Sequence, residues 1–182
     1  MKDLSLHILD LVQNSIRAKA SEIQVMVIEN HDRNRYVLSI KDNGSGMDRK
    51  TLEKAIDPFY TSRTTRKVGL GLSLIKQNAE QAGGIFSIKS EPGKGTLLEA
   101  TFQHDHLDRP SLGDISGTIV LIAAANPSIC LKYIHQTPDG DYEFNTNEVR
   151  QVLDDVPLSD VQIQASLREM ITENLKTIRY SK

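Results

Sequence analysis

The sequence predicts an α+β protein that carries an α/β extension at its C-terminal end. Apolar residues recur at helical spacing over residues 4–20, which is typical of a helix with one buried face. They alternate with polar residues over 22–29 and again over 36–41, as expected for half-buried strands. Turns that contain glycine then separate a second helical pattern from further strands, so helices and strands follow one another along the chain.

The first elements are set by apolar spacing and by their boundaries. The helix over 4–20 leads into strands over 22–29 and 36–41, which a polar loop joins as a hairpin. A short helix over 49–56 begins after Asp48, whose carboxylate can cap it. An Asp-Pro pair ends this helix, because the residue before a proline is pushed out of the helical region.

The next segment is a polar, basic stretch over 59–68 that we expect to be a loop. A helix over 70–82 follows, and a Gly-Gly pair ends it, as glycine commonly does after a helix. Two more strands, over 85–90 and 96–102, are joined by a turn that contains proline and glycine. That turn composition indicates an antiparallel pair.

The character of the chain changes after these strands. We therefore expect a first domain over residues 1–103 and an extension over 104–182. Residues 113–125 are too apolar for periodicity to distinguish a helix from a buried strand. Asp114, which can cap a helix, and the Asn-Pro pair that follows the segment favour the helix.

The rest of the extension contains a hairpin and two helices. Strands over 129–136 and 141–145 flank a Thr-Pro-Asp-Gly turn, a strong hairpin signal. Helices are expected over 146–154 and 159–178. So much apolar sequence must be buried, and we expect the extension to pack on the first domain, support it and offer a docking surface to a partner.

Composition narrows the class of protein. The chain has 182 residues, 38% hydrophobic and 25% charged, with a net charge of −2. This excludes a disordered or fibrous protein and gives no sign of a nucleic-acid or membrane partner. No apolar run approaches the roughly 20 residues of a membrane helix. One cysteine, Cys130, cannot form an internal disulfide, so we expect a cytoplasmic protein.

A turn that follows the strand over 36–41 is the first candidate binding element. It begins at Asp42 and contains Gly44 and Gly46. A carboxylate at a strand end can accept an N–H in a fixed direction, which suits the exocyclic amine of adenine, and the glycines allow the backbone to approach the base. Asp-Asn-Gly is also ordinary surface-turn chemistry, so the turn alone leaves both interpretations open.

A polar stripe on the first helix is the second candidate. Asp10, Asn14 and Arg17 stand at positions i, i+4 and i+7, which share one face. The amide oxygen of Asn14 can join water and phosphate oxygens around Mg²⁺. Asp10 can receive a proton from an attacking water or hydroxyl, and Arg17 can contact phosphate. A solvated polar face is the alternative.

A glycine pair at the start of the helix over 70–82 is the third candidate. Gly69 and Gly71 leave backbone N–H groups uncovered at a helix N-terminus, where phosphate binds readily. A plain glycine-containing helix entry is disfavoured because glycine in a helix costs stability. The basic loop over 62–67 fits either a phosphate lid or an ordinary solvated loop.

Taken in order, these segments resemble the GHKL superfamily of ATPases, which includes gyrase, a heat-shock chaperone, histidine kinases and MutL. Residues 9–15 match its N box, and 42–47 match its G1 box. Residues 57–63 resemble the histidine-kinase F box, 69–76 match the G2 box, and 83–96 resemble the histidine-kinase ending. The resemblance covers about residues 4–102.

The resemblance implies the Bergerat fold, a two-layer α/β sandwich with a mixed sheet and helices on one face. It also implies ATP bound with Mg²⁺ through Asn14, adenine recognised by Asp42, and Asp10 as the catalytic acid or base. The remaining box positions expected to contact nucleotide are Arg17, Gly44, Gly46, Met47, Arg63, Gly69, Leu70, Gly71, Leu72 and Thr96.

Departures from the family pattern shape the expected function. Histidine kinases carry a dimerisation helix pair with the phosphoacceptor histidine before the N box, where this sequence begins. ATP-hydrolysing members have Glu in place of Asp10, and Lys67 and Val68 replace a common Gly-Thr pair, which predicts a short lid and ready nucleotide exchange. We expect a stand-alone ATP-dependent regulator that phosphorylates or controls a protein partner. An ATP-hydrolysing switch and a non-catalytic ATP sensor are the alternatives, and the oligomeric state stays open.

Overall fold

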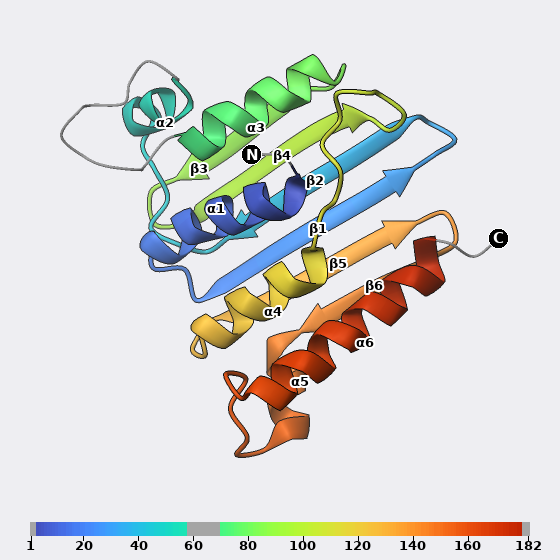
Figure 1. Cartoon of the computed structure of the whole chain (residues 1–182). Coiled ribbons are helices and arrows are strands. Elements are labelled where there is room, and N and C mark those ends of the chain that lie inside the picture. The colour runs from blue at the N-terminus through green and yellow to red at the C-terminus, as the bar shows by residue number, and fades with distance from the viewer. Residues whose placement is uncertain (1–2, 58–69, 180–182) are drawn as a thin grey trace.

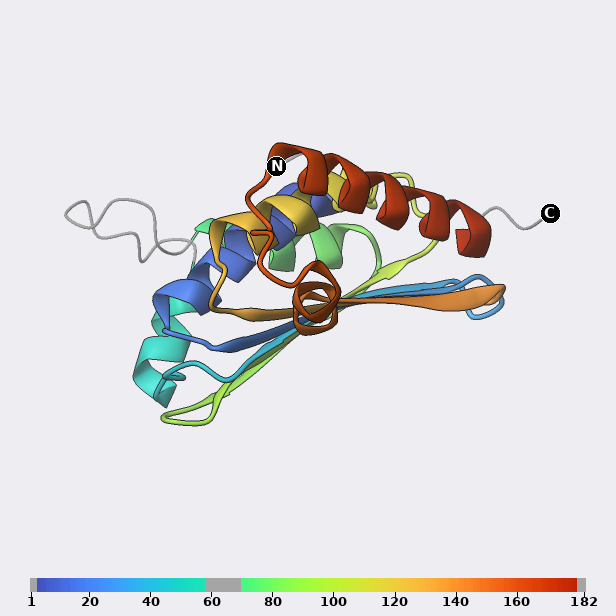
Figure 2. The same ribbon diagram turned by 90° about the horizontal axis from the view of Figure 1, so that it is seen from below.

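The computed structural model describes residues 3–57 and 70–179 of the chain. It contains one six-stranded sheet in the order β3-β4-β2-β1-β5-β6 (Figure 1). Helices α1, α3, α4 and α6 lie together on one face of this sheet (Figure 2). The α+β class, the mixed sheet and the helical layer on one face are therefore confirmed.

The helices and strands occupy these ranges. Residues before 104 form α1 (Leu4–Arg17), β1 (Glu22–Asn30), β2 (Arg35–Asp42), α2 (Arg49–Ile56), α3 (Leu70–Gln81), β3 (Phe86–Glu91) and β4 (Gly95–Gln103). Later residues form α4 (Ile115–Ala125), β5 (Cys130–Thr137), β6 (Gly140–Asn145), α5 (Thr146–Leu153) and α6 (Val161–Arg179). The elements expected from the sequence are present with ends shifted by a few residues, and the loop predicted over 59–68 lies outside the described residues.

Short polar side chains begin several helices, as the sequence indicates. The Asp48 carboxylate accepts a hydrogen bond from the N–H of Thr51 at 2.7 Å, at the start of α2. Asp114 accepts one from the N–H of Gly117 at 3.0 Å. The ambiguous segment over 113–125 is thus a helix, α4. The Asp114 cap stabilises its start because it satisfies an N–H that has no partner within the helix.

Strand β1 lies between the two parts of the chain. It pairs with β2 in antiparallel register, with Ile23 opposite Asp42. On its other side it pairs in parallel with β5, with Glu22 opposite Cys130. Both edges of β1 are thus hydrogen-bonded, and β5 and β6 extend the same sheet.

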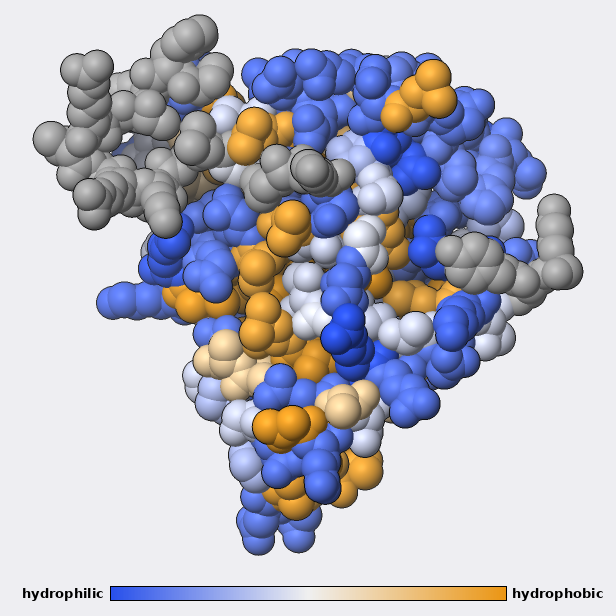
Figure 3. Space-filling model, in the orientation of Figure 1, coloured by the Kyte–Doolittle hydropathy of each residue, from blue (hydrophilic) through white to orange (hydrophobic). Residues whose placement is uncertain are grey.

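The core lies between the sheet and the helical layer. Alternate residues of β1 point into it, and α6 presents an apolar stripe of Leu167, Ile171, Leu175 and Ile178. Helix α4 buries Ile119 completely beside α1. Figure 3 shows apolar side chains gathered on the outside of this layer, where a groove between α1, α4 and α6 is lined in part by the exposed Leu6 and Leu121. No helix within the described ranges is both long and apolar enough to cross a membrane.

Candidate functional site

The Asp42 carboxylate is held at the end of β2 by two hydrogen bonds. The hydroxyl of Ser15 donates to Oδ2 at 2.6 Å, and the N–H of Gly44 donates to Oδ1 at 2.9 Å. Ser15 comes from the buried side of α1, so the first bond joins that helix to the sheet. The half-buried carboxylate is therefore fixed in direction by groups from two segments.

The turn after Asp42 is tied to the connection between α1 and β1. The side-chain oxygen of Asn43 accepts hydrogen bonds from the N–H groups of Ser21 and Glu22, each at 2.9 Å. The N–H of Ser45 donates to the carbonyl of Ala18 at 2.8 Å. The Asp-Asn-Gly turn is therefore part of the packed structure and is not a free surface loop.

Met47 and Thr96 meet through a serine that the sequence analysis did not select. The hydroxyl of Ser90 accepts a hydrogen bond from the N–H of Met47 at 2.8 Å and lies 2.9 Å from the Thr96 hydroxyl. Thr96 stands opposite Asp42 in the β2–β4 pairing. The predicted positions on the turn and on β4 thus lie side by side.

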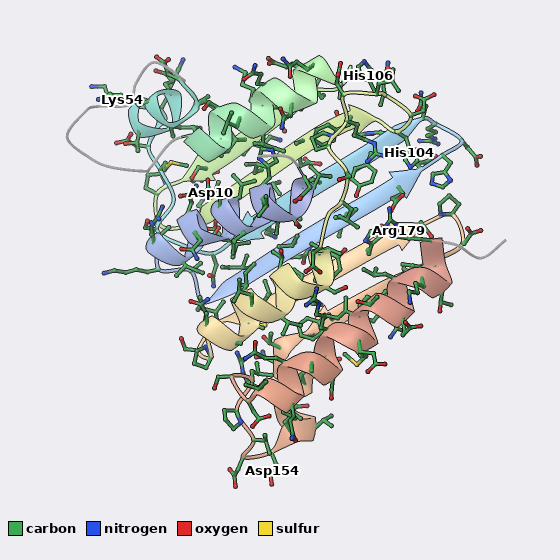
Figure 4. All side chains as sticks on the ribbon, viewed as in Figure 1. Asp10, Lys54, His104, His106, Asp154 and Arg179 are labelled. Atoms are coloured by element: carbon green, nitrogen blue, oxygen red, sulfur yellow. The ribbon has the colours of Figure 1, made fainter. Side chains whose placement is uncertain are left out.

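Asp10, the first residue of the stripe on α1, lies against the start of α3. Figure 4 shows Asp10 on α1 beside this region, and a Cβ added to Gly71 would lie 1.9 Å from Asp10 Oδ2. Only glycine allows this approach, because any side chain would displace the carboxylate. One turn along α1, Asn14 Oδ1 accepts a hydrogen bond from Arg17 Nη1 at 3.2 Å.

The structure therefore brings together most of the predicted site residues. Asp10, Asn14 and Arg17 come from α1, and the carboxylate of Asp42 is joined to the same helix through Ser15. Leu72 is largely buried in the core beneath the start of α3. The predicted contacts at Arg63 and Gly69 and the side chain of Leu70 lie outside the described residues.

A buried histidine joins the two helices that border the site. Asn78 on α3 donates from its amide nitrogen to Nε2 of His7 on α1, at 2.8 Å. His7 is fully buried, and this burial lowers the pKa of His7 from 6.5 to about 4. The ring is therefore neutral at pH 7.

This histidine should make the stability of the fold depend on pH. The unfolded chain binds a proton at His7 near pH 6.5 and the folded chain only near pH 4, so lowering the pH through this window favours unfolding. We expect the contribution of His7 to the free energy of unfolding to fall by up to about 1.4 kcal/mol for each unit by which the pH is lowered. Urea unfolding at several pH values should show this slope reduced in His7→Gln and kept in His106→Gln. Equal slopes in all three proteins would contradict the assignment.

The same segments are matched in known proteins. The sequence model of the histidine kinase-, DNA gyrase B- and HSP90-like ATPases matches residues 2–106. This chain belongs to that family. The match covers the helices and strands that carry Asp10, Asn14 and Asp42, so the family and the site geometry agree on the same half of the molecule.

Among curated GHKL relatives, a protein of Shewanella frigidimarina that is named as a sensor is 38% identical over 97 residues, which is 52% of this chain and 15% of that protein. The sensor histidine kinase YxdK of Bacillus subtilis is 33% identical over 75 residues, or 39% of this chain and 23% of the relative. The chain thus spans less than a quarter of the length of either relative.

A solved structure supports the fold of this GHKL chain. The crystal structure of the N-terminal domain of a DNA repair protein superposes with a TM-score of 0.56 and 21% sequence identity. The superposition covers 80% of this chain and 52% of the other. At this level of identity the likeness concerns the fold alone.

Proposed function

We propose that this protein binds ATP with Mg²⁺ between α1, the turn after β2 and the start of α3, and uses it to phosphorylate or control a protein partner. The observation that carries the proposal is the Asp42 carboxylate, which Ser15 and Gly44 fix through both oxygens. Membership of the GHKL family supports it. The curated relatives include proteins that are named histidine kinases.

The fixed carboxylate suits an adenine base. Each oxygen of Asp42 accepts one hydrogen bond from the protein, and a carboxylate oxygen can accept a second. Because the side chain is only half-buried, that capacity is open to a ligand. In this proposal Asp42 accepts the exocyclic N–H of adenine, and Gly44, Gly46, Met47 and Thr96 form the wall around the base.

The start of α3 suits the phosphates. A helix N-terminus carries a partial positive charge and exposed N–H groups, and Gly71 keeps the first turn bare beside α1. The Asp10 carboxylate at the same place would repel phosphate, so a cation is needed between them. Asn14 offers an oxygen ligand of the type that Mg²⁺ prefers, and Arg17 beside it adds a positive charge. Bound Mg²⁺ would neutralise charge on the phosphates.

The role of Asp10 separates three versions of this function. As an acceptor of a proton from a partner's side chain it would serve a kinase, and as an acceptor from water it would serve an ATPase. Without either role the chain would be a non-catalytic ATP sensor. We favour the kinase because curated relatives of this half are named histidine kinases, and we propose a cytoplasmic protein whose partner docks on the lid side or on residues 104–182.

A single-turnover experiment with γ-labelled ATP tests these versions. The full chain is incubated with labelled ATP, with and without cell lysate. A labelled protein band supports the kinase, free phosphate supports the ATPase, and neither product with calorimetric ATP binding supports the sensor. Asp10→Asn should keep ATP binding and lose either product. Absence of ATP binding in the unmodified chain would overturn the proposal.

Removal of the Asn14 amide tests the Mg²⁺ site. Asn14→Ala should weaken ATP binding in Mg²⁺ by about tenfold, the equivalent of a lost hydrogen bond to a charged group, and much less in EDTA, because only the metal-dependent part is lost. Arg17→Ala is the comparison variant: it removes a positive charge beside the phosphates and the contact to Asn14 but leaves the oxygen ligand, so its loss of affinity should be similar in both buffers. Titration calorimetry in both buffers measures the difference. Equal losses of ATP affinity in both buffers for Asn14→Ala would indicate packing damage and not the loss of a Mg²⁺ ligand.

A further inference from the structure

A cluster of histidines surrounds one buried carboxylate far along the sheet from Asp42. Glu29 lies near the end of β1 and is 6% exposed. His31 follows it in the loop to β2, His104 follows β4, and His135 lies in β5. Figure 4 shows His104 and Arg179 at the end of the sheet where α6 finishes. The function proposed above uses none of these residues.

One oxygen of Glu29 is held from the extension side. His135 Nε2 lies 2.8 Å and Arg179 Nε 2.7 Å from Oε1. Since a carboxylate only accepts hydrogen bonds, His135 donates through Nε2, and its Nδ1 accepts from the Tyr133 hydroxyl at 2.6 Å. These two contacts, from His135 and Arg179, fix the Glu29 carboxylate in position.

The other oxygen of Glu29 faces two imidazoles. His104 Nε2 lies 3.3 Å and His31 Nε2 3.7 Å from Oε2, and the centroids of the two rings are 4.3 Å apart. The distance to His31 is too long for a hydrogen bond. Hydrogen bonding therefore accounts for the approach of His104 to Oε2 but not for the approach of His31 to the same oxygen.

The spacing of these three atoms fits a metal ion. Glu29, His31 and His104 each offer one ligand atom, a carboxylate oxygen or a ring nitrogen, and these three atoms all lie within 4.8 Å of one another. Zinc bonds of about 2.0–2.2 Å place two tetrahedral ligands about 3.4 Å apart, close to the two distances to Oε2. His31 has 51% and His104 has 23% of its side chain exposed, so the cluster opens to solvent on one side.

The segments that carry the two histidines are locked together. The N–H of His104 donates to the carbonyl of Asn34 at 3.1 Å. The side chain of Asn34 donates to Asp105 at 2.7 Å and accepts from the Asp105 N–H at 3.1 Å. The loop after β1 and the segment after β4 are therefore held in fixed positions, as a preorganised metal site requires.

We propose that Glu29, His31 and His104 bind a zinc ion, with the fourth position open to solvent. Two imidazoles and a carboxylate suit Zn²⁺ and related transition metals, and Mg²⁺ prefers sites made of oxygen alone. His135 and Arg179 act as positioning residues that orient the carboxylate. The charge of Arg179 opposes a cation, but Arg179 contacts Oε1 of Glu29, whereas His31 and His104 face Oε2.

The position of this site gives the ion a structural role. Its ligands come from β1, from the β1–β2 loop and from the segment after β4, and its positioning residues come from β5 and α6. Zinc would therefore brace the junction between residues 1–103 and the extension. A ligand that binds only the folded chain stabilises it, so zinc should raise the unfolding temperature.

Calorimetric titration of the metal-free full chain with ZnCl₂ tests the proposal. We expect one Zn²⁺ per chain, and His31→Gln and His104→Gln should each weaken this binding by at least tenfold. His106→Gln is the matched control, since His106 lies in the same segment with its Nδ1 near Asp108 and outside the cluster. Co²⁺ should give the visible absorption of a tetrahedral nitrogen and oxygen site, and excess Mg²⁺ should not compete.

Thermal unfolding provides the second readout. Zinc should raise the unfolding temperature of the unmodified chain and of His106→Gln, but not that of the two ligand variants. Both substituted histidines are partly exposed, so circular dichroism should show folded variants. Zinc binding of unchanged strength in His31→Gln or His104→Gln, or no stoichiometric binding in the unmodified chain, would overturn the proposal.

Discussion

Replacement of Asp42 by Asn is expected to weaken ATP binding by about 10- to 150-fold, or about 1.5–3 kcal/mol, the range for a hydrogen bond to a charged group. The variant keeps an oxygen for the N–H of Gly44 but turns an amide N–H toward the Ser15 hydroxyl, which can rotate to accept it. The turn should therefore stay in place. The variant loses the charge of the carboxylate and one of its two acceptor oxygens, which the proposed contact to adenine requires.

Calorimetric ATP titration of folded Asp42→Asn measures this effect. Asp141→Asn is the matched control, because Asp141 is exposed on β6, at the far edge of the sheet from β3. Its affinity should equal that of the unmodified chain. Unchanged affinity in Asp42→Asn would remove this carboxylate from the proposed adenine site and leave the function resting on the family alone.

Gly95→Ala is expected to lower the free energy of unfolding by about 2–6 kcal/mol, as the sum of backbone strain and overpacking. Gly95 begins β4 with φ of +97°, and an added Cβ would lie 2.0 Å from the backbone oxygen of Asp42. The methyl group would force β4 away from β2 where Thr96 pairs with Asp42. Loss of stability and loss of ATP binding should therefore occur together.

Gly93 in the same turn provides the control. Its φ is +76°, but an added Cβ would meet no atom within 4 Å. Gly93→Ala should therefore cost only the left-handed backbone strain, about 1–2 kcal/mol. Urea unfolding of both variants separates the two effects. Equal losses would show that the approach to Asp42 is unimportant and that φ alone explains the requirement for glycine.

Local patterns were sufficient to predict the elements and the site stripe. The i, i+4, i+7 spacing placed Asp10, Asn14 and Arg17 on one face of a helix, because helical geometry depends only on neighbours along the chain. The same reasoning identified the strand that ends at Asp42. The side chains Ser15 and Ser90 were missed. A small hydroxyl carries no periodic signal, and its value here lies in partners distant in sequence.

Local sequence patterns also could not predict which strands pair with one another. Alternation identifies the strand over 129–136, but not that it lies parallel to β1, because pairing depends on contacts between distant residues. One available signal was not used. The buried positions Val25 and Val27 of β1 continue at Glu29, so the alternation itself places a carboxylate on the covered face, where it must find partners.

The pairing of β1 with β5 has a consequence for the newly made chain. Glu22 emerges from the ribosome long before Cys130, its partner in the sheet, so one edge of β1 stays unpaired while the residues between them are made. Such an edge is a template for pairing with another chain, and contacts between distant residues form slowly. The half of the molecule that belongs to the ATPase family therefore passes through a stage prone to self-association, which ends only when β5 docks.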